Sequence, residues 1–132
     1  MKKLMSLLLA LIMVIGTMTV PAFAYSDVED GTYTSEAITI LTDLDILHGF
    51  VDGSFKPDDT ITRAQMATVI CNALGYGEIG QTTTVFKDVP KEHWASGYIG
   101  MINGLGIVAG YGGGYYGPED PVTYEQVAKI IV

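Results

Sequence analysis

Apolar residues follow two different patterns along this chain: a continuous block at its start and a helical periodicity after it. Residues 4–20 are almost uninterruptedly apolar, with Met1-Lys2-Lys3 before them and Pro21-Ala22-Phe23-Ala24 after them. A cationic start, an apolar stretch and small residues before a cleavage point are typical of a secretory signal peptide. We therefore predict that residues 1–24 are removed on export. An uncleaved membrane anchor is the alternative, because this apolar stretch reaches the lower length limit for a span.

Two later stretches carry apolar residues at helical i, i+3/i+4 and i+7 spacing, which predicts one amphipathic helix in each. In the first stretch the apolar residues are Ala37, Ile40, Leu41, Leu44 and Leu47. The equivalent residues of the second stretch are Tyr98, Met101, Ile102, Leu105 and Val108. We expect both helices to bury this stripe. Gly49 and Gly110 follow the last periodic residue, where a left-handed residue commonly ends a helix.

A second helix in each stretch has a clear start. Thr62 suits the N-cap, Gln65 completes a capping box with it, and Ile61 precedes the cap as the outer half of a hydrophobic staple. The other stretch repeats this arrangement with Thr123, Gln126 and Val122. Both second helices are therefore predicted to begin directly after a threonine cap.

These stretches are two copies of one unit. Residues 25–71 align with residues 86–132 without a gap at an offset of 61, and 14 of the 47 positions are identical. Repetition at a fixed period indicates a duplicated supersecondary unit. We predict a mainly α fold of tandem helix–loop–helix repeats: repeat 1 over 25–75, a Gly- and Thr-rich linker over 76–85, and repeat 2 over 86–132, truncated at its C-terminus.

The loops between the helices, 49–60 and 110–121, carry turn signals between aromatic residues. Asp52-Gly53 and Gly113-Gly114 predict tight turns that join the arms of a short two-stranded ribbon. The second loop is rich in glycine, but it lacks the GxxxxGK[ST] order of a phosphate-binding loop.

Composition excludes several classes of function. The 15 acidic and 7 basic residues give a net charge of −8, and removal of the signal peptide makes it −10. This balance argues against nucleic-acid binding, which requires clustered Lys and Arg. The single cysteine, Cys71, excludes an internal disulfide and lies on an apolar helix face, where we expect it to be buried. His48 and His93 are not equivalent and lack metal-ligand spacing, so we expect surface or capping roles, with no metal and no cofactor.

Several segments together resemble one family, the S-layer homology (SLH) domain. They are Phe86-Lys87-Asp88-Val89, His93-Trp94-Ala95, Gly110-Tyr111, Pro118 and, in the first copy, Asp52-Gly53-Ser54-Phe55 and Thr62-Arg63-Ala64-Gln65. The last of these resembles the family's Thr-Arg-Ala-Glu segment, with Gln in place of Glu. The resemblance covers nearly all of the chain after residue 24.

The resemblance implies a non-catalytic module, not an enzyme, that holds exported proteins on the bacterial cell wall. Such domains typically bind a secondary cell wall polysaccharide that often carries pyruvylated N-acetylmannosamine. They usually pack in threes as a pseudo-three-fold helical prism with ligand grooves between repeats. We accordingly expect a secreted protein of the cell surface, with no membrane span after signal cleavage. A surface adhesion or S-layer assembly module using Tyr111, Tyr115 and Tyr116, without glycan binding, is the alternative.

Two repeats build only part of such a prism, because repeat units depend on stacked neighbours. We therefore interpret the sequence as a truncated product or a piece of a longer surface protein. Self-association of several chains is the other way to complete the prism. On either interpretation we expect residues 25–132 alone to be marginally stable.

The candidate glycan-binding residues follow from the chemistry of a pyruvylated sugar. Its carboxylate requires a cation or helix N-terminal N–H groups, and Arg63 lies at the first position of a helix. The alternative for Arg63 is a solvated helix-start residue. Gln65 is a further candidate contact, although its capping role accounts for it equally well. The equivalent of Arg63 in the second copy is Tyr124, so repeat 2 lacks the cation and is expected to be mainly structural.

A sugar ring also requires an apolar platform and close approach of the backbone. Tyr33 and Trp94 are candidate platforms, with a core position as the alternative for Trp94. Gly49 and Gly110 are candidates for the close approach. Asp27 and Asp88, at the start of each repeat, are expected to cap backbone N–H groups rather than to bind ligand.

Overall fold

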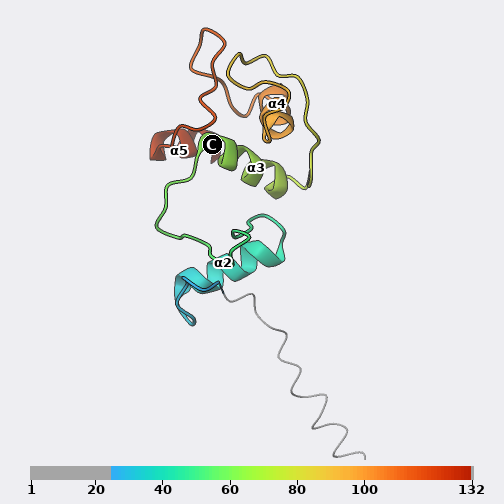
Figure 1. The fold of residues 1–132 in the computed structure, drawn as a ribbon. Coiled ribbons are helices and arrows are strands. Elements are labelled where there is room, and N and C mark those ends of the chain that lie inside the picture. The colour runs from blue at the N-terminus through green and yellow to red at the C-terminus, as the bar shows by residue number, and fades with distance from the viewer. Residues whose placement is uncertain (1–24, 132) are drawn as a thin grey trace, which may run out of the picture.

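The computed structural model describes residues 25–131, and the predicted signal peptide, residues 1–24, lies outside them. Four α-helices make up the regular structure of the described part (Figure 1). They are α2 (Tyr33–Asp43), α3 (Arg63–Ala73), α4 (Ser96–Gly104) and α5 (Tyr124–Ile131). None of the helices within residues 25–131 has the length and apolar character to cross a membrane. The mainly helical class predicted from the sequence is thus confirmed.

Threonine caps start three of the helices. At α3 the N–H of Gln65 donates to Thr62 Oγ1 at 3.2 Å, and the N–H of Thr62 donates to Gln65 Oε1 at 2.8 Å. Thr123 and Gln126 form the same reciprocal pair at α5. Both predicted capping boxes are therefore confirmed. A third box, between Thr32 and Ser35 at the start of α2, was not predicted.

The predicted helix ends are wrong. The left-handed residues after α2 and α4 are Asp45 (φ 60°) and Gly106 (φ 75°), not Gly49 and Gly110. The N–H of Asp45 bonds back to Thr42 O, and the N–H of Gly106 to the equivalent carbonyl of Asn103. The first helix of each repeat therefore ends before its last periodic apolar residues, which lie in the following turn.

The loops of the two repeats share part of their backbone conformation and differ at the tip, where Gly112 and Gly113 have positive φ and the equivalent Val51 and Asp52 do not. Gly53 and Gly114 have φ of 84° and 83°, while Lys56 and its counterpart Gly117 have φ of 57° and 71°. Hairpin hydrogen bonds are also duplicated: Phe50 N donates to Ser54 O and Tyr111 N to Tyr115 O. Within residues 25–131 the predicted ribbons are reduced to these tight turns, with one isolated bridge between Gly112 and Tyr115.

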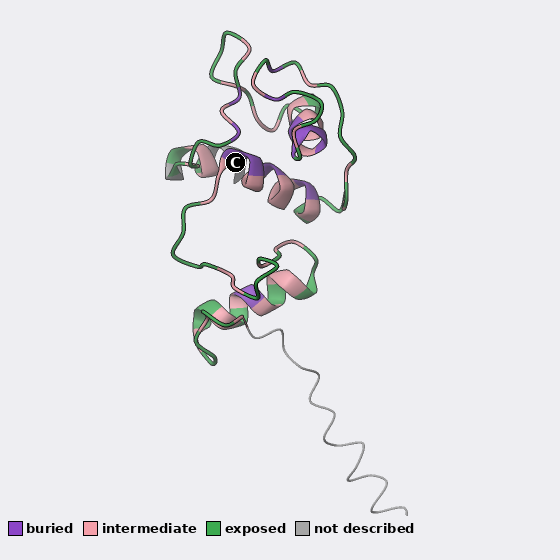
Figure 2. Cartoon of the chain, viewed as in Figure 1, coloured by how far each residue is buried: buried purple, intermediate pink, exposed green. Residues whose placement is uncertain are grey.

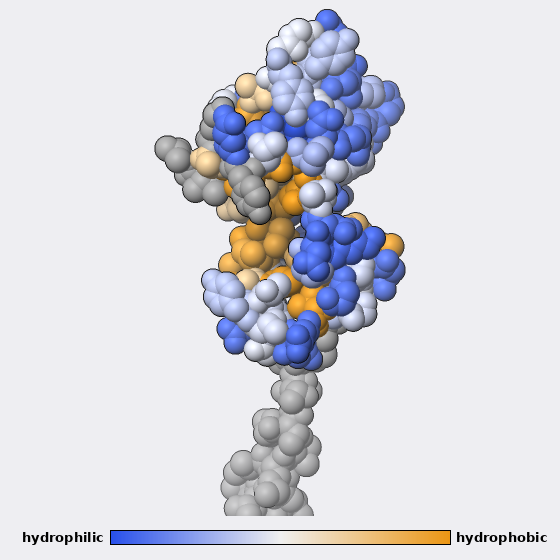
Figure 3. Space-filling model, turned by 90° about the vertical axis from the view of Figure 1, so that its left-hand side faces the viewer, coloured by the Kyte–Doolittle hydropathy of each residue, from blue (hydrophilic) through white to orange (hydrophobic). Residues whose placement is uncertain are grey.

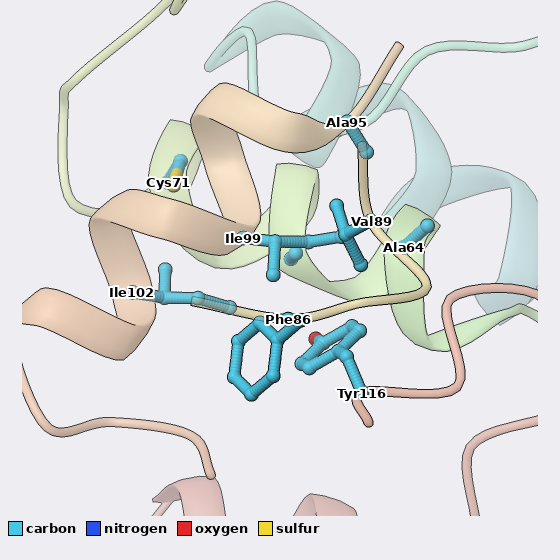
Figure 4. Close-up of a cluster of buried hydrophobic side chains, with 9 residues drawn as sticks. Ala64, Cys71, Phe86, Val89, Ala95, Ile99, Ile102 and Tyr116 are labelled. Atoms are coloured by element: carbon cyan, nitrogen blue, oxygen red, sulfur yellow. The ribbon is translucent and has the colours of Figure 1, made fainter. Parts of the chain in front are cut away.

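The hydrophobic core forms between the repeats. Among the described helices, α3 of repeat 1 and α4 of repeat 2 are the one pair that packs together. Ala64, Ala67 and Cys71 supply the face of α3, and small side chains there let the helices approach closely. The residues facing them are Phe86, Val89, Ala95, Ile99, Ile102 and Tyr116 (Figure 4). The second helix of repeat 1, α3, thus completes the core of repeat 2.

The prediction that both copies bury the same stripe is wrong. Of the repeat 1 stripe, Ile40 is 58% exposed and Leu44, the C-cap of α2, is 61% exposed. In repeat 2, Met101 packs against the core and Ile102 is fully buried, although Leu105 is 48% exposed. Buried residues accordingly concentrate on α3 and α4 (Figure 2). The difference arises because α3 covers α4, whereas no described helix covers α2.

The segment predicted as a linker lies along α4. Thr82 N donates to Ser96 Oγ at 3.1 Å, and Ile79 packs against the core. Gly97 permits this contact, because a Cβ there would meet Gly80 O and the side chain of Ile79. The connection between the repeats is therefore part of the packed structure.

Candidate functional site

Arg63, the only arginine of the chain, connects the two repeats. Its Nε donates to Tyr116 O at 2.8 Å and its Nη2 to Ala109 O at 3.1 Å. The guanidinium carbon lies 4.6 Å from the centre of the Tyr111 ring and 4.4 Å from that of Tyr116. Only 8% of the residue is exposed. The alternative that Arg63 is a solvated helix-start residue is therefore wrong.

The start of α3 is bonded to the loop of repeat 2. The N–H groups of Arg63 and Ala64 donate to the carbonyls of Asp120 and Pro118, each at 2.9 Å. The N–H of Gln65 is used in the capping box. These N–H groups are therefore engaged within the chain, and they are not available to a ligand carboxylate.

Asp88 and Asp27 hold the loops of their repeats in place. Asp88 accepts the N–H groups of Tyr116 at 2.9 Å and Gly117 at 2.8 Å. Asp27 accepts the equivalent pair, Phe55 and Lys56, at 2.8 and 2.7 Å. The predicted capping role of both aspartates is confirmed.

Both carboxyl groups have lowered pKa values. For Asp27 the main cause is the hydrogen bond from the N–H of Phe55. For Asp88, partial burial alone would raise the pKa, but the N–H groups of Tyr116 and Gly117 and the charge of Arg63 outweigh it. Hydrogen bonds that require the charged form favour it, so both aspartates are ionised at neutral pH.

A shallow surface groove lies beside Arg63, between the start of α3, the second loop and the start of α5. Its apolar lining consists of Met66, Ile70, Val108 and Val122, with the Tyr116 ring beside them. Arg63 and Gln126 supply its polar groups. The lining of the groove can therefore contact a small group that carries both apolar and polar atoms.

The comparison with known families agrees with the duplicated architecture. The S-layer homology domain matches residues 24–67 and again residues 85–128. The chain belongs to the S-layer homology (SLH) family.

Three relatives extend the comparison. A "Cell surface protein" of Thermoanaerobacter kivui is 33% identical over 138 residues, covering 99% of this chain and 18% of the relative. A "Surface layer protein" of Brevibacillus choshinensis is 32% identical over 139 residues, covering 100% of this chain and 12% of the relative. A "Cellulosome-anchoring protein" of Acetivibrio thermocellus is 32% identical over 87 residues, covering 64% of this chain and 20% of the relative. The chain thus spans at most a fifth of the length of these relatives. Family and relatives together indicate a secreted protein of the cell surface.

Tyr33 and Trp94 occupy equivalent positions of the two SLH repeats, and both lie at the surface. Tyr33 is 87% exposed and Trp94 50% exposed, so the core alternative for Trp94 is wrong. The Trp94 ring stacks on His93 with centroids 5.8 Å apart. His93 Nδ1 accepts the N–H of Ala95 at 3.1 Å, which confirms its capping role. The other ring nitrogen, Nε2, lies 3.3 Å from Glu119 Oε1.

Gly49 and Gly110 permit close approach of other parts of the chain. A Cβ at Gly49 would meet the Tyr25 ring and Ser54 O, and one at Gly110 would meet the Phe86 ring and Tyr115 O. The equivalent contacts in both SLH repeats account for glycine at this position. A contact between either glycine and a ligand stays a prediction.

The structure brings together only some of the candidates. Arg63 and Gln65 share the first turn of α3, and Gly110 follows the residue whose carbonyl accepts from Arg63. Tyr33 and Gly49 belong to the part around α2, at the opposite end of the described molecule from the second loop (Figure 1). Sequence reasoning missed Gln126 as a groove residue, although its equivalence to Gln65 was a signal for it.

Cys71 is a packing residue. Its side chain is completely buried, and burial raises the pKa of the thiol. The expected buried position is confirmed. Residues 25–131 contain no cluster of three or more His, Cys, Asp or Glu side chains placed to hold a metal ion.

Proposed function

We propose that this chain anchors an exported protein to the bacterial cell wall by binding a secondary cell wall polysaccharide in the groove beside Arg63. The observation that carries the proposal is the position of this groove: an SLH chain forms it where its two repeats meet. Neither repeat forms it alone, because Arg63 and Tyr116 come from different repeats. The relative named as a cellulosome-anchoring protein supports the anchoring role.

The chemistry of the groove supports a sugar with an acidic substituent, such as a pyruvyl ketal. Arg63 uses Nε and Nη2 within the chain, which leaves Nη1 for an oxygen of the ligand. A ligand anion there offsets a cation placed at a helix N-terminus, where the dipole disfavours it. Met66 and Val122 provide apolar contact for a methyl or acetyl group.

Trp94 offers a second contact for the same polymer. Half of its surface is open, and indole rings provide flat apolar platforms with a polar edge. Tyr33 offers the equivalent platform in repeat 1. We propose that these rings bind sugar units outside the groove, so that their removal weakens binding without abolishing it.

Co-sedimentation with purified Gram-positive cell-wall sacculi, before and after acid extraction of the secondary polymer, tests the proposal. We expect binding to intact walls and loss of binding to extracted walls. Val122→Arg fills the groove and should abolish binding, whereas Val85→Arg makes the same change at an exposed valine outside the groove. Trp94→Ala should reduce binding severalfold. Thermal melting of each variant verifies that it is folded.

A second candidate function is protein–protein adhesion through the second loop. Tyr111 and Tyr115 are each more than half exposed there, and tyrosine is enriched at protein interfaces. Binding that persists on extracted walls, and that is lost on Tyr115→Ala rather than Val122→Arg, would replace the glycan proposal with this one.

A further inference from the structure

Each repeat presents an equivalent surface, but α3 covers only one of them. The second-repeat face, formed by α4 and loop 110–121, receives α3. The first-repeat face, formed by α2 and loop 49–60, receives no helix from the described part of the chain. Figure 3 shows hydrophobic residues at the surface between the part containing α2 and the part containing α3 and α5.

Burial differs at equivalent positions of the two faces. Val89 is 1% exposed, whereas its counterpart Val28 is only half-buried. Met101 packs against the core, whereas its counterpart Ile40 is exposed. The side chains are apolar at both positions in both repeats. The first-repeat face therefore has the composition of a covered surface without the helix that covers it.

The loop of the first-repeat face also has open backbone acceptors. In repeat 2 the carbonyls of Pro118 and Asp120 accept the first N–H groups of α3. The equivalent carbonyls of Pro57 and Asp59 accept no hydrogen bond from residues 25–131. The turns that carry these carbonyls are equivalent: each begins with a left-handed residue, Lys56 or Gly117, whose carbonyl accepts the N–H of the aspartate three positions later. The first loop therefore presents its carbonyls in the arrangement that receives a helix start in the second.

The complementary element is α5, the counterpart of α3. It begins with the same threonine–glutamine capping box, and it packs against no other helix of the described chain. Ala67 of α3 is completely buried against repeat 2, whereas its counterpart Ala128 is exposed. One chain thus carries both halves of the interface that α3 makes, and Ala128 in one half and Ile40 in the other are exposed.

We propose that α5 of one copy docks on the first-repeat face of a second copy, as α3 docks on the second-repeat face within one chain. Charge permits this pairing. The Lys56 ammonium lies over the Phe50 ring, 4.4 Å from its centre. In repeat 2 the Arg63 guanidinium lies in the same way over the equivalent ring, that of Tyr111. Residue 124, the counterpart of Arg63, is a tyrosine, so docking brings no second cation to Lys56.

The contact joins two different surfaces, so association is head-to-tail. Such heterologous contacts form rings where the rotation closes and open chains where it does not. The start of α5 also lines the groove through Gln126, but Ala128 and Ile40 lie outside the groove lining, so variants at these two positions test association separately from glycan binding.

Sedimentation velocity tests the proposed association. It is measured from micromolar to millimolar concentration on the full chain recovered from the culture medium. Ala128→Arg disrupts the donor half and Ile40→Lys disrupts the receiving half. Each places an unpaired charge in the contact and should weaken association at least about tenfold. Both positions are exposed in a single copy, so both variants should fold, as circular dichroism would verify. Val85→Arg, at an exposed position outside both α5 and the first-repeat face, is the control and should associate normally.

Mixing the variants gives the decisive result. Ala128→Arg keeps a working first-repeat face and Ile40→Lys keeps a working α5, so an equimolar mixture should form heterodimers and nothing larger. The proposal is overturned if the unmodified chain stays monomeric throughout, if neither variant weakens association, or if the mixture stays monomeric.

Discussion

Replacement of Arg63 by alanine should destabilise the whole packed region rather than only remove a ligand contact. The substitution deletes two hydrogen bonds from a charged donor, which contribute about 1.5–3 kcal/mol each. It also deletes two ring contacts at 4.6 and 4.4 Å, worth about 0.5–2 kcal/mol each. These terms share one guanidinium and do not add, so we expect a loss of about 3–5 kcal/mol in the free energy of unfolding.

That loss approaches the total stability of a small domain, about 5–15 kcal/mol. Arg63→Lys keeps the charge but cannot supply the planar fork, so we expect a loss of about 2 kcal/mol. The single tryptophan, Trp94, lies just before α4 and its fluorescence reports on this region. Urea titrations followed by this fluorescence and by circular dichroism, at concentrations where the chain is monomeric, give both free energies.

Lys56→Ala provides the matched control. It also removes a cation over an aromatic ring, at 4.4 Å, but in an exposed loop and without bonds to buried carbonyls. Its expected cost is below about 1 kcal/mol. If Arg63→Ala were no more destabilising than Lys56→Ala, the contacts of Arg63 would not hold the repeats together. Weakened wall binding by Arg63→Ala could then be assigned directly to the ligand.

Three further predictions concern the loops and the core. Residue 56 has φ 57°, a conformation that glycine adopts without strain, so Lys56→Gly should be more stable than Lys56→Ala by about 1 kcal/mol in urea unfolding. Gly117→Ala should be destabilising in the same assay, because Gly117 has φ 71°. Asp27 and Asp88 have lower pKa values in the folded than in the unfolded protein, so their ionised carboxylates stabilise the fold at any pH above the unfolded-state pKa of about 3.9. This stabilisation should be lost as the pH falls through their folded-state pKa values. Asn at either position should flatten the acid limb of a plot of urea midpoint against pH. The Cys71 thiol should react with a thiol reagent only in urea, whereas reaction of the native protein would contradict its burial.

Sequence reasoning succeeded where the determining residues are close together in the chain. A capping box depends on two residues three positions apart, and Thr62 with Gln65 was sufficient to place the start of α3. The end of α2 was missed because Asp45, a non-glycine residue, takes the left-handed conformation there. The equivalent residue of repeat 2 is Gly106, and a glycine at that position indicates the helix end, because Asp45 and Gly106 form the same backbone turn.

The partners of Arg63 could not be inferred in this way. They lie 46 and 53 residues further along the chain, in the other repeat, and a helix-start arginine has the same local pattern whether it is solvated or buried. The same limit applied to the apolar stripe. Periodicity identifies the face of a helix that can be buried, whereas the neighbouring elements decide how much of it is buried.

The packing unit of this protein is offset from its sequence repeat, and that offset explains why its candidate site requires two repeats. Because α3 packs on α4, the core extends from Arg63 to Tyr116 and includes the connection at 79–84. An isolated repeat would contain α3 without the helix that α3 covers, or α4 without its cover. It would also contain either Arg63 or the carbonyls that fix the Arg63 side chain, but not both. Folding and formation of the groove therefore depend on the same contact, so substitutions that separate the repeats should abolish wall binding even where they touch no ligand.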